Sequence, residues 1–289
     1  MSAILSTQNL VKKYGYKIVS NNISLTINKG DIYGFVGKNG AGKTTFMRQV
    51  LGLAFPDSGE IILFGGEPLN TARKKIGSLI EFPSIYKNCT AYENMKRMAI
   101  LTGSSDKSVR KILDFVGLGN TGNKKAGQFS LGMRQRLGIA MALLGNPELL
   151  ILDEPINGLD PTGIMEIRDL IIRLNTEKKI TFMISSHLLE ELSKIATRYG
   201  FIHDGKLIEE ISAVELSQKC SDRVLIVPDN PQKAAEILSK IMQPQQILRL
   251  HFSETYFLTK LRYTTAQVLC VTENFLRQDV YYRLQITKM

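Results

Sequence analysis

Glycines and a lysine that could bind phosphate occur together near the N-terminus. The segment GKNGAGKT, residues 37 to 44, fits the pattern G-x-x-x-x-G-K-[ST] of a phosphate-binding loop, or P-loop. Glycines let backbone N–H groups wrap around a phosphate, Lys43 can pair with the β- and γ-phosphates, and Thr44 can ligate Mg²⁺. We therefore predict a nucleoside triphosphate site whose binding residues are Gly37, Asn39, Gly40, Ala41, Gly42, Lys43, Thr44 and Thr45.

Two adjacent carboxylates could supply the chemistry of hydrolysis. Asp153 and Glu154 follow the apolar run LLIL, residues 149 to 152, which predicts a buried strand. A carboxylate at the end of such a strand suits a contact with Mg²⁺, which is the role we predict for Asp153. Glu154 suits polarising the attacking water. Together with the P-loop, this pair predicts a protein that hydrolyses ATP or GTP.

Strands that alternate with helices must position these residues. DIYGFVG, 31 to 37, predicts a strand before the P-loop, and the next residues, 44 to 53, predict a helix. Further strands are predicted at 60–65, 78–80, 149–152 and 180–186, with helices at 90–118, 130–144, 164–174 and 188–196. Several of these strands are apolar throughout, which favours a parallel sheet covered on both faces. Residues 23–27 alternate as in a half-buried strand, and 201–210 predict a β-hairpin.

Composition sets the limits of the prediction. The 289 residues are 44% apolar and 22% charged, which suits one large domain and a small appendage. No apolar run reaches the roughly 18 residues of a membrane span, and the first residues lack the pattern of a secretory signal. Three widely separated cysteines, Cys89, Cys220 and Cys270, favour a reducing compartment. The net charge of +10 is scattered in twos and threes, so we expect no nucleic-acid partner.

The segment FSLGMRQRLGIAMALLGNP, 129 to 147, carries a resemblance to a known family. It resembles the signature of ABC transporter ATP-binding subunits, which begins Leu-Ser-Gly-Gly-Gln. Ser130 and Gly132 match that signature, whereas Leu131 replaces the first glycine and Met133 replaces the glutamine. NGLDP, 157 to 161, and SSH, 185 to 187, follow in the order of the family.

The resemblance covers about residues 4 to 218 and implies a fold. That fold is an α/β, P-loop NTPase, ABC-type nucleotide-binding domain with a mostly parallel sheet core, an antiparallel β subdomain and a helical subdomain at about 85–147. We therefore predict an ATP-binding domain at 1–218. A small α+β module of unknown role is predicted at 219–289, with strands near 222–228, 248–254 and 266–273 and one helix.

The resemblance also implies site residues. Tyr14 is expected to stack on adenine, with Tyr16 as the alternative, and His187 is expected to contact the γ-phosphate and to act in catalysis together with Lys43 and Glu154. In the family, the signature residues of one subunit face the P-loop of the other, and Asp160 bridges the two subunits. We therefore expect two copies of this chain in a head-to-tail dimer that binds ATP through Ser130 and Gly132. The dimer would attach to separate permease subunits at the cytoplasmic face of the cell membrane.

One position departs from most of the family. In SLIEFPSIY, 78 to 86, Glu81 stands where the family usually carries a glutamine that contacts Mg²⁺ and the attacking water. Glutamate there is typical of the bacitracin and lantibiotic exporter group. The resemblance therefore predicts Glu81 as a metal-site residue, and the chain as the ATPase of a peptide antibiotic exporter that gives resistance or immunity.

Three alternatives remain open at this point. The first is a soluble ABC ATPase that acts on nucleic acid or the ribosome, although neither a long coiled coil nor a second ATPase domain is visible. The second is a transporter subunit with a different cargo. The third is a nucleotide sensor without turnover, which the intact Glu154 disfavours.

Overall fold

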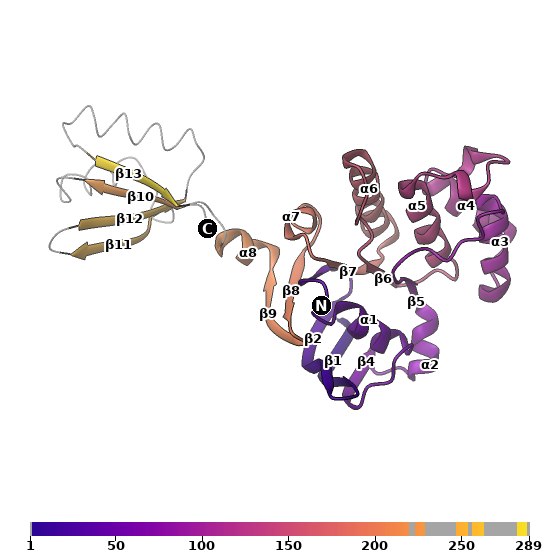
Figure 1. Cartoon of the computed structure of the whole chain (residues 1–289), viewed down its shortest axis with the longest axis horizontal. Coiled ribbons are helices and arrows are strands. Elements are labelled where there is room, and N and C mark those ends of the chain that lie inside the picture. The colour runs from indigo at the N-terminus through magenta and orange to yellow at the C-terminus, as the bar shows by residue number, and fades with distance from the viewer. Residues whose placement is uncertain (1, 220–222, 229–246, 254–255, 263–281, 288–289) are drawn as a thin grey trace. The chain divides into compact units, whose positions relative to one another are not determined.

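The computed structural model describes residues 2–219, 223–228, 247–253, 256–262 and 282–287. The chain divides into two compact units, Met1–Ala213 and Val214–Met289 (Figure 1). The first unit holds every site residue that the sequence predicts. Among the described residues, the helices lack the combination of length and apolar composition that a membrane span requires.

A six-stranded sheet forms the centre of the first unit. Its order is β5-β6-β7-β3-β8-β9, from the strands β3 (Ile32–Val36), β5 (Ile76–Leu79), β6 (Leu149–Asp153), β7 (Thr181–Ser186), β8 (Arg198–His203) and β9 (Lys206–Ser212). All neighbours are parallel except β8 and β9, which form the predicted hairpin. Every residue of β3, β6 and β7 is buried, as the apolar runs predicted. The prediction of a mostly parallel α/β sheet is confirmed.

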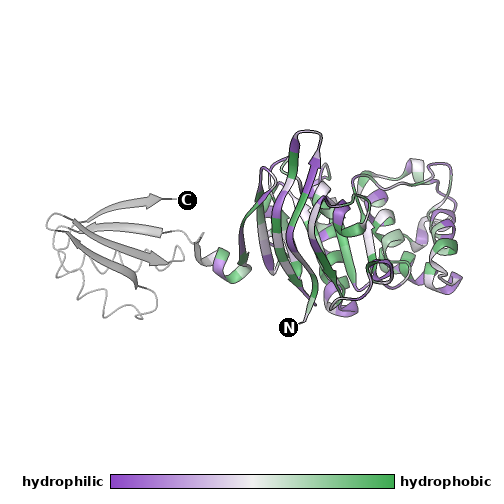
Figure 2. Cartoon of the chain, turned by 90° about the horizontal axis from the view of Figure 1, so that it is seen from below, coloured by the Kyte–Doolittle hydropathy of each residue, from purple (hydrophilic) through white to green (hydrophobic). Residues whose placement is uncertain are grey.

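An antiparallel sheet packs beside the central one. Its order is β2-β1-β4, from β1 (Ala3–Tyr14), β2 (Lys17–Asn28) and β4 (Ser58–Leu63). Hydrophilic and hydrophobic residues alternate along several strands of this unit (Figure 2). In β2 the alternation buries Ile23, Leu25 and Ile27 against the core, as expected for a strand with one solvated face.

The P-loop helix α1 (Lys43–Leu51) belongs to the core that joins the two sheets. Its buried Phe46 lies 5.3 Å from the ring of Phe35 in β3, measured between ring centroids. Apolar residues of β1, β2, β6 and β7 complete this core. The helix is therefore fixed by packing on both sheets, which fixes the loop in front of it.

The helical part contains α3 (Ala91–Thr102), α4 (Asp106–Phe115) and α5 (Leu131–Ala142). The single helix predicted for 90–118 is wrong, because Gly103 ends α3 with a φ of 66° and Ser105 caps α4. Asn94 in α3 is buried, and its amide bonds to backbone atoms of Tyr86 and Thr90, which fixes the loop before the helix.

Helix α6 (Pro161–Lys178) is longer than predicted, because Asp160 caps it and Pro161 starts it. The predicted helix 188–196 contracts to α7 (Leu189–Leu192), after which residues 193–196 form hydrogen-bonded turns. In Figure 1, α5 and α6 lie above β6 and β7, whereas α1 lies below them. Short helical segments occur at Leu69–Ala72 (α2), Arg73–Lys75, Gly119–Thr121, Ala126–Gln128 and Ala213–Lys219 (α8).

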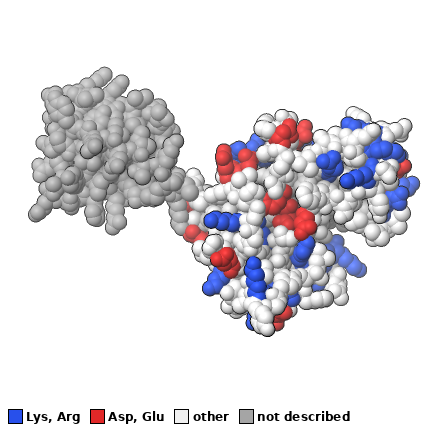
Figure 3. Space-filling view, in the orientation of Figure 1, with Lys and Arg blue, Asp and Glu red and all other residues white. Residues whose placement is uncertain are grey.

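Charge is distributed unevenly over the first unit. Residues 84–147, which include α3 to α5, contain ten Lys and Arg but three Asp and Glu. Residues 148–213 contain seven Lys and Arg but twelve Asp and Glu. Figure 3 shows blue cationic side chains gathered over the helical part. One unit therefore carries a basic part and an acidic part.

The second unit contains a four-stranded antiparallel sheet of order β11-β12-β10-β13. The strands are β10 (Arg223–Pro228), β11 (Ile247–Ser253), β12 (Tyr256–Arg262) and β13 (Tyr282–Thr287). The strands predicted near 222–228 and 248–254 are present, whereas β12 and β13 were not predicted. The predicted strand at 266–273 and the predicted helix lie outside the described residues.

Candidate nucleotide site

The P-loop leaves room only for glycine at two positions. A Cβ atom at Gly42 would lie 2.4 Å from the carbonyl oxygen of Val19, and one at Gly37 would lie 2.5 Å from that of Ile202. Gly40 has open space around it but a φ of 81°, which side chains rarely adopt. The glycines are therefore required by the close packing and by the turn of the backbone.

The other predicted loop residues surround this turn. Ala41 is buried, and its carbonyl oxygen accepts a hydrogen bond from Gly205 N at 2.9 Å. Asn39 is exposed, and Thr45 is half-buried in the first turn of α1. The loop is thus fixed on its inner side by the β8–β9 turn, while its outer side is exposed.

Three predicted catalytic residues meet beside the P-loop. The ammonium group of the buried Lys43 donates hydrogen bonds to the carbonyl oxygens of Gly37 at 2.6 Å and Lys38 at 3.3 Å. It also lies 3.1 Å from Glu154 Oε1, an ion pair that lacks hydrogen-bond geometry. The other carboxylate oxygen, Oε2, lies 2.8 Å from His187 Nδ1. The structure thus brings together residues from α1 and from the ends of β6 and β7.

Asp153 holds a second part of the site together. Thr44 Oγ1 donates to Asp153 Oδ2 at 2.6 Å, and Ser185 Oγ donates to Asp153 Oδ1 at 2.5 Å. Ser185 Oγ also accepts a hydrogen bond from the backbone N–H of Glu154 at 2.8 Å. Asp153 is only 3% exposed and Ser185 is fully buried, so these hydrogen bonds replace water for the carboxylate.

Sequence reasoning missed Ser185 as a site residue. The signal that could have found it is a serine near the end of an otherwise apolar strand, two residues before His187. A buried hydroxyl in such a strand needs a partner, and here the partner is the predicted metal ligand Asp153.

Thr44 and Asp153 offer oxygen donor atoms of the type that Mg²⁺ prefers. Mg²⁺ prefers hard oxygen donors and is commonly held by one or two protein groups, with phosphate oxygens completing the shell. The hydroxyl of Thr44 and the carboxylate of Asp153 are 2.6 Å apart, at the start of the P-loop helix. This pair of donors is suited to an ion that arrives with a nucleotide.

Two carboxylate residues near the ends of central strands adopt the left-handed backbone conformation. Glu154 has a φ of 49° and follows β6, and Glu81 has a φ of 63° and lies just beyond β5. This conformation is uncommon for residues other than glycine and costs of order 1–3 kcal/mol. At Glu154, the hydrogen bond from its backbone N–H to Ser185 Oγ stabilises this conformation. The backbone that carries the Glu154 carboxylate is therefore held in one orientation.

Glu81 does not join the Thr44–Asp153 pair. Its carboxylate pairs with the guanidinium group of Arg48, on α1, at 2.7 Å, and its side chain is 58% exposed. Among the described residues, Glu81 makes no hydrogen bond or ion pair with Thr44 or Asp153. Its predicted place in the metal site therefore stays a prediction. Sequence reasoning did not foresee Arg48 as its partner.

The predicted adenine-stacking residue lies at the end of β1. Tyr14 is 53% exposed, and the ammonium group of Lys12 lies 5.3 Å from the centroid of its ring. Tyr16, the alternative, is fully exposed in the same hairpin. Both residues are exposed, so the stacking of either ring on adenine stays a prediction.

The signature residues and Asp160 bond within their own helices. Ser130 Oγ caps α5 by accepting from Met133 N at 3.2 Å, and Asp160 Oδ1 caps α6 by accepting from Gly163 N at the same distance. No bond joins Ser130 or Asp160 to the P-loop among the hydrogen bonds of the described residues. Gly132 follows in the first turn of α5 with space for a Cβ atom. Among the described residues, Ser130 and Asp160 therefore act as helix caps and make no hydrogen bond with the P-loop of the same chain.

Comparison with known proteins identifies the family. The family model described as "ABC transporter" matches residues 20–157. The chain is 49% identical to the bacitracin transport ATP-binding protein BcrA of Enterococcus faecalis, covering 76% of this chain and 72% of that protein. It is 48% identical to the lantibiotic transport ATP-binding protein SrtF of Streptococcus pyogenes, covering 72% of this chain and 90% of that protein.

Solved structures agree with this result. The chain is 25% identical to the ABC transporter component cbiO1 from Clostridium perfringens. The alignment covers 76% of this chain and 92% of cbiO1, with a TM-score of 0.69. A dimeric post-hydrolysis state of the ATP-binding cassette MJ0796, bound to ADP and Pi, is also 25% identical. The alignment covers 72% of this chain and 98% of the MJ0796 chain, with a TM-score of 0.64. The resemblance seen in the sequence is confirmed: the chain belongs to the ABC transporter family, as a subunit that binds and hydrolyses ATP.

Proposed function

We propose that this chain powers the export of a peptide antibiotic of the bacitracin or lantibiotic kind through a separate membrane permease, giving resistance or immunity. Two observations support this cargo class. The relatives at 48–49% identity carry bacitracin and lantibiotic transport in their names. Glu81 also stands at the position where that exporter group typically carries glutamate.

The observation that carries the ATPase role is the position of Glu154 between Lys43 and His187. An ionised carboxylate can only accept hydrogen bonds, so His187 donates from Nδ1 and orients Oε2. Oε1 is buried next to Lys43 and accepts no hydrogen bond among the described residues, so it keeps an acceptor site for a water that would enter with the nucleotide. Lys43 supplies positive charge next to it, where the γ-phosphate would gain negative charge.

We assign the metal ligands to Thr44 and Asp153. When bound there, Mg²⁺ would neutralise charge on the β- and γ-phosphates. Ser185 holds the Asp153 carboxylate in place by its 2.5 Å hydrogen bond and the backbone of Glu154 by a second one. The same hydroxyl thus aligns the predicted metal ligand with the predicted general base.

We further propose that two copies assemble head to tail. Ser130 and Asp160 bond within their own helices, which leaves the P-loop of the same chain without a signature partner. A second copy would supply that partner, as the family resemblance implies and as the dimeric MJ0796 structure supports. The basic 84–147 part and the acidic 148–213 part favour an arrangement in which unlike parts face each other.

The permease would dock beside β5. A cavity of about 1060 Å³ lies between β5, α3 and α5. Phe82 and Leu101, which help to line it, are 80% and 81% exposed and could pack on an apolar partner surface. Docking there would place the chain at the cytoplasmic face of the membrane.

Substitution of the general base tests the proposal. We expect Glu154→Gln to bind ATP while turnover falls by about 10²–10⁴, because an amide cannot take the proton of water. Glu148→Gln, at a half-buried position just before the same strand and away from Lys43 and His187, serves as the matched control and should keep full turnover. Unchanged hydrolysis in Glu154→Gln would refute the assigned role.

The cargo is tested on the copurified permease complex. We expect bacitracin or a lantibiotic to stimulate ATP hydrolysis above the basal rate. If only an unrelated compound stimulates hydrolysis, the transporter role stands but the proposed cargo class is wrong. A complex that contains a single copy of this chain would overturn the proposed dimer.

A further inference from the structure

A second cavity lies at the edge of the central sheet opposite the nucleotide site. Its volume is about 490 Å³, within the range that holds small molecules. Glu148 and Ile180, which line it, directly precede β6 and β7, and Lys29 lies shortly before β3. Asp153 ends β6 and His187 follows β7, so the nucleotide site occupies the other ends of the same strands. The five residues of β6 span roughly 17 Å between the two sites.

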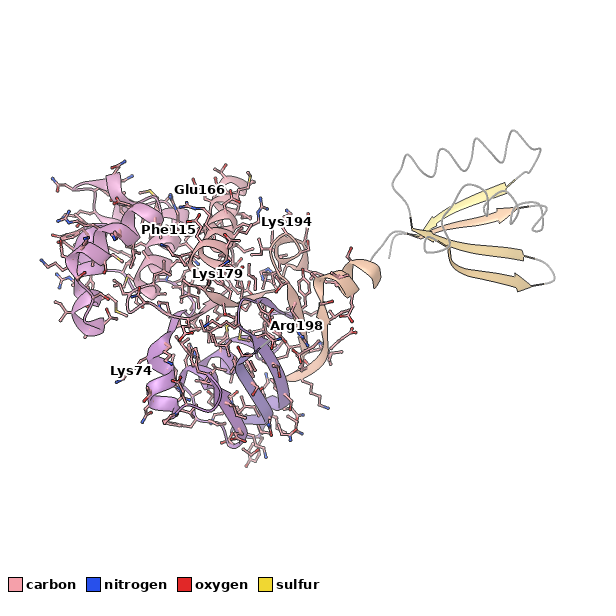
Figure 4. All side chains as sticks on the ribbon, turned by 180° about the vertical axis from the view of Figure 1, so that it is seen from behind. Lys74, Phe115, Glu166, Lys179, Lys194 and Arg198 are labelled. Carbon is pink, nitrogen blue, oxygen red and sulfur yellow. The ribbon has the colours of Figure 1, made fainter. Side chains whose placement is uncertain are left out.

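The floor of this cavity is apolar. Side chains from α4, from the end of α5 and from α6 and the segment after it converge there: Ile112, Phe115, Leu143, Leu174 and Ile180. Figure 4 labels two lining residues, Phe115 and Lys179, which come from α4 and from the end of α6. The floor can therefore cover an aromatic or aliphatic body of limited size.

The rim of the cavity is basic. Four lysines, Lys29, Lys111, Lys178 and Lys179, line it together with one acidic residue, Glu148. Glu148 already lies 3.0 Å from Lys29 and 3.9 Å from Lys75, so its charge is shared. Lys111 and Lys179 have no ion-pair partner among the described residues.

Cations also surround the aromatic ring in the floor. The guanidinium group of Arg173 lies 4.3 Å from the centroid of the Phe115 ring, and the ammonium group of Lys178 lies 5.5 Å from it. Glu177 pairs with Arg173 at 3.3 Å, which leaves the excess of positive charge on the lysines. Like charges on one rim repel each other, and an anion placed among them relieves that repulsion.

The apolar floor and the basic rim together favour one kind of ligand. An inorganic anion would leave the apolar floor exposed to water, and a neutral apolar molecule would leave the lysine rim without counter-charge. We propose that this cavity binds a small amphipathic anion, with one or two acid groups on an aromatic or aliphatic body. The acid groups would pair with Lys111 and Lys179, and the body would pack on Phe115 and its apolar neighbours.

A matched pair of fluorescent probes tests this inference on the full chain. One is 8-anilinonaphthalene-1-sulfonate, an aromatic body with one acid group, and the other is N-phenyl-1-naphthylamine, the same body without it. The sequence contains no tryptophan, so Phe115→Trp adds a single reporter to the cavity floor. We expect the sulfonate to quench this reporter saturably and to bind at least about tenfold more tightly than the neutral probe, equivalent to about 1.4 kcal/mol.

Charge reversal then locates the acid group. The double variant Lys111→Glu, Lys179→Glu should weaken sulfonate binding by about tenfold or more and leave the neutral probe unchanged. Lys107→Glu is the control, because this exposed lysine lies on α4 but does not line the cavity. If the charge-reversed chain fails to fold, the same substitutions to glutamine provide the comparison, with a smaller loss expected.

Three results would overturn the proposal. The first is equal affinity for the two probes, which would indicate an apolar patch without charge recognition. The second is a loss in Lys107→Glu as large as in the double variant, which would indicate general attraction to a basic protein. The third is displacement of the sulfonate by ATP in competition with it, which would place the probe in the nucleotide site. Binding that persists with saturating ATP supports a separate site.

Discussion

Ser185 gives the sharpest test of how the nucleotide site is held together. Replacing it by alanine removes one hydrogen bond to the buried Asp153 carboxylate and one from the backbone N–H of Glu154. A bond to a charged group contributes about 1.5–3 kcal/mol and a neutral one about 1 kcal/mol, so we expect a loss of roughly 2–4 kcal/mol in the free energy of unfolding. For a domain of this size, that corresponds to a fall in Tm of about 5–15 °C.

Catalysis should suffer separately from stability. Ser185 stabilises the left-handed backbone of Glu154, so without it the general base loses its fixed position. We expect kcat for ATP hydrolysis to fall by about 10–100-fold, with a smaller change in KM. The measurements are urea unfolding and steady-state ATPase activity on the same preparations.

Ser186→Ala provides the control on the same strand. The hydroxyl of Ser186 accepts from Leu188 N at 2.9 Å and donates to Leu188 O at 3.3 Å, and it bonds to neither Asp153 nor Glu154. This variant should lose about 1–2 kcal/mol and keep kcat within about threefold of the unmodified protein. If the two alanine variants have the same kcat, the reasoning about Ser185 is wrong.

Three further predictions concern other parts of the first unit. Asn94→Ala removes buried side-chain bonds to the backbone of the loop before α3, and we expect a loss of about 2–3 kcal/mol with faster hydrogen exchange in that loop. The Arg48–Glu81 pair is largely exposed, so a double-mutant cycle should give a coupling below about 1 kcal/mol; a larger value contradicts a weak surface pair. Burial, and then the Glu210 carboxylate, raise the pKa of Tyr33 well above its ordinary value. The folded chain therefore keeps the Tyr33 proton when the unfolded chain loses it, so this stabilisation is complete below about pH 10 and is lost as the pH rises further. Tyr33→Phe should flatten the fall of stability above pH 10 in urea titrations, and an unchanged slope would count against this assignment.

The sequence was sufficient for the parts of the site that local patterns determine. The P-loop glycines, the apolar run before Asp153 and the serine that caps α5 each leave a short, specific pattern. For the same reason the buried strands and the central parallel sheet could be predicted. The exact ends of the helices could not, because a single glycine at 103 or a capping serine at 105 outweighs an apolar spacing that continues past it.

Contacts between segments that are distant in the chain could not be predicted from the sequence. Ser185 and Asp153 are 32 residues apart, and Arg48 and Glu81 are 33 apart, with no pattern that links them. Their pairing depends on the order β5-β6-β7-β3, which places β6 next to β7 and puts α1 near the residues that follow β5. The second cavity was missed for the same reason, because its four lysines come from three separate segments.

The position of β3 in the sheet has a consequence for synthesis of the chain. This strand leads into the P-loop, yet its neighbours on both sides are β7 and β8, so that Ile32 lies opposite Phe182. At about 5–20 residues per second, roughly 8–30 s separate the translation of these partners. During that interval β3, which is fully buried in the folded chain, lacks both of its neighbouring strands. The P-loop after it therefore lacks the segments that fix its conformation. The nascent chain should therefore gain its affinity for nucleotide late and abruptly, and ribosome-bound chains truncated before residue 181 should need a chaperone to stay unaggregated.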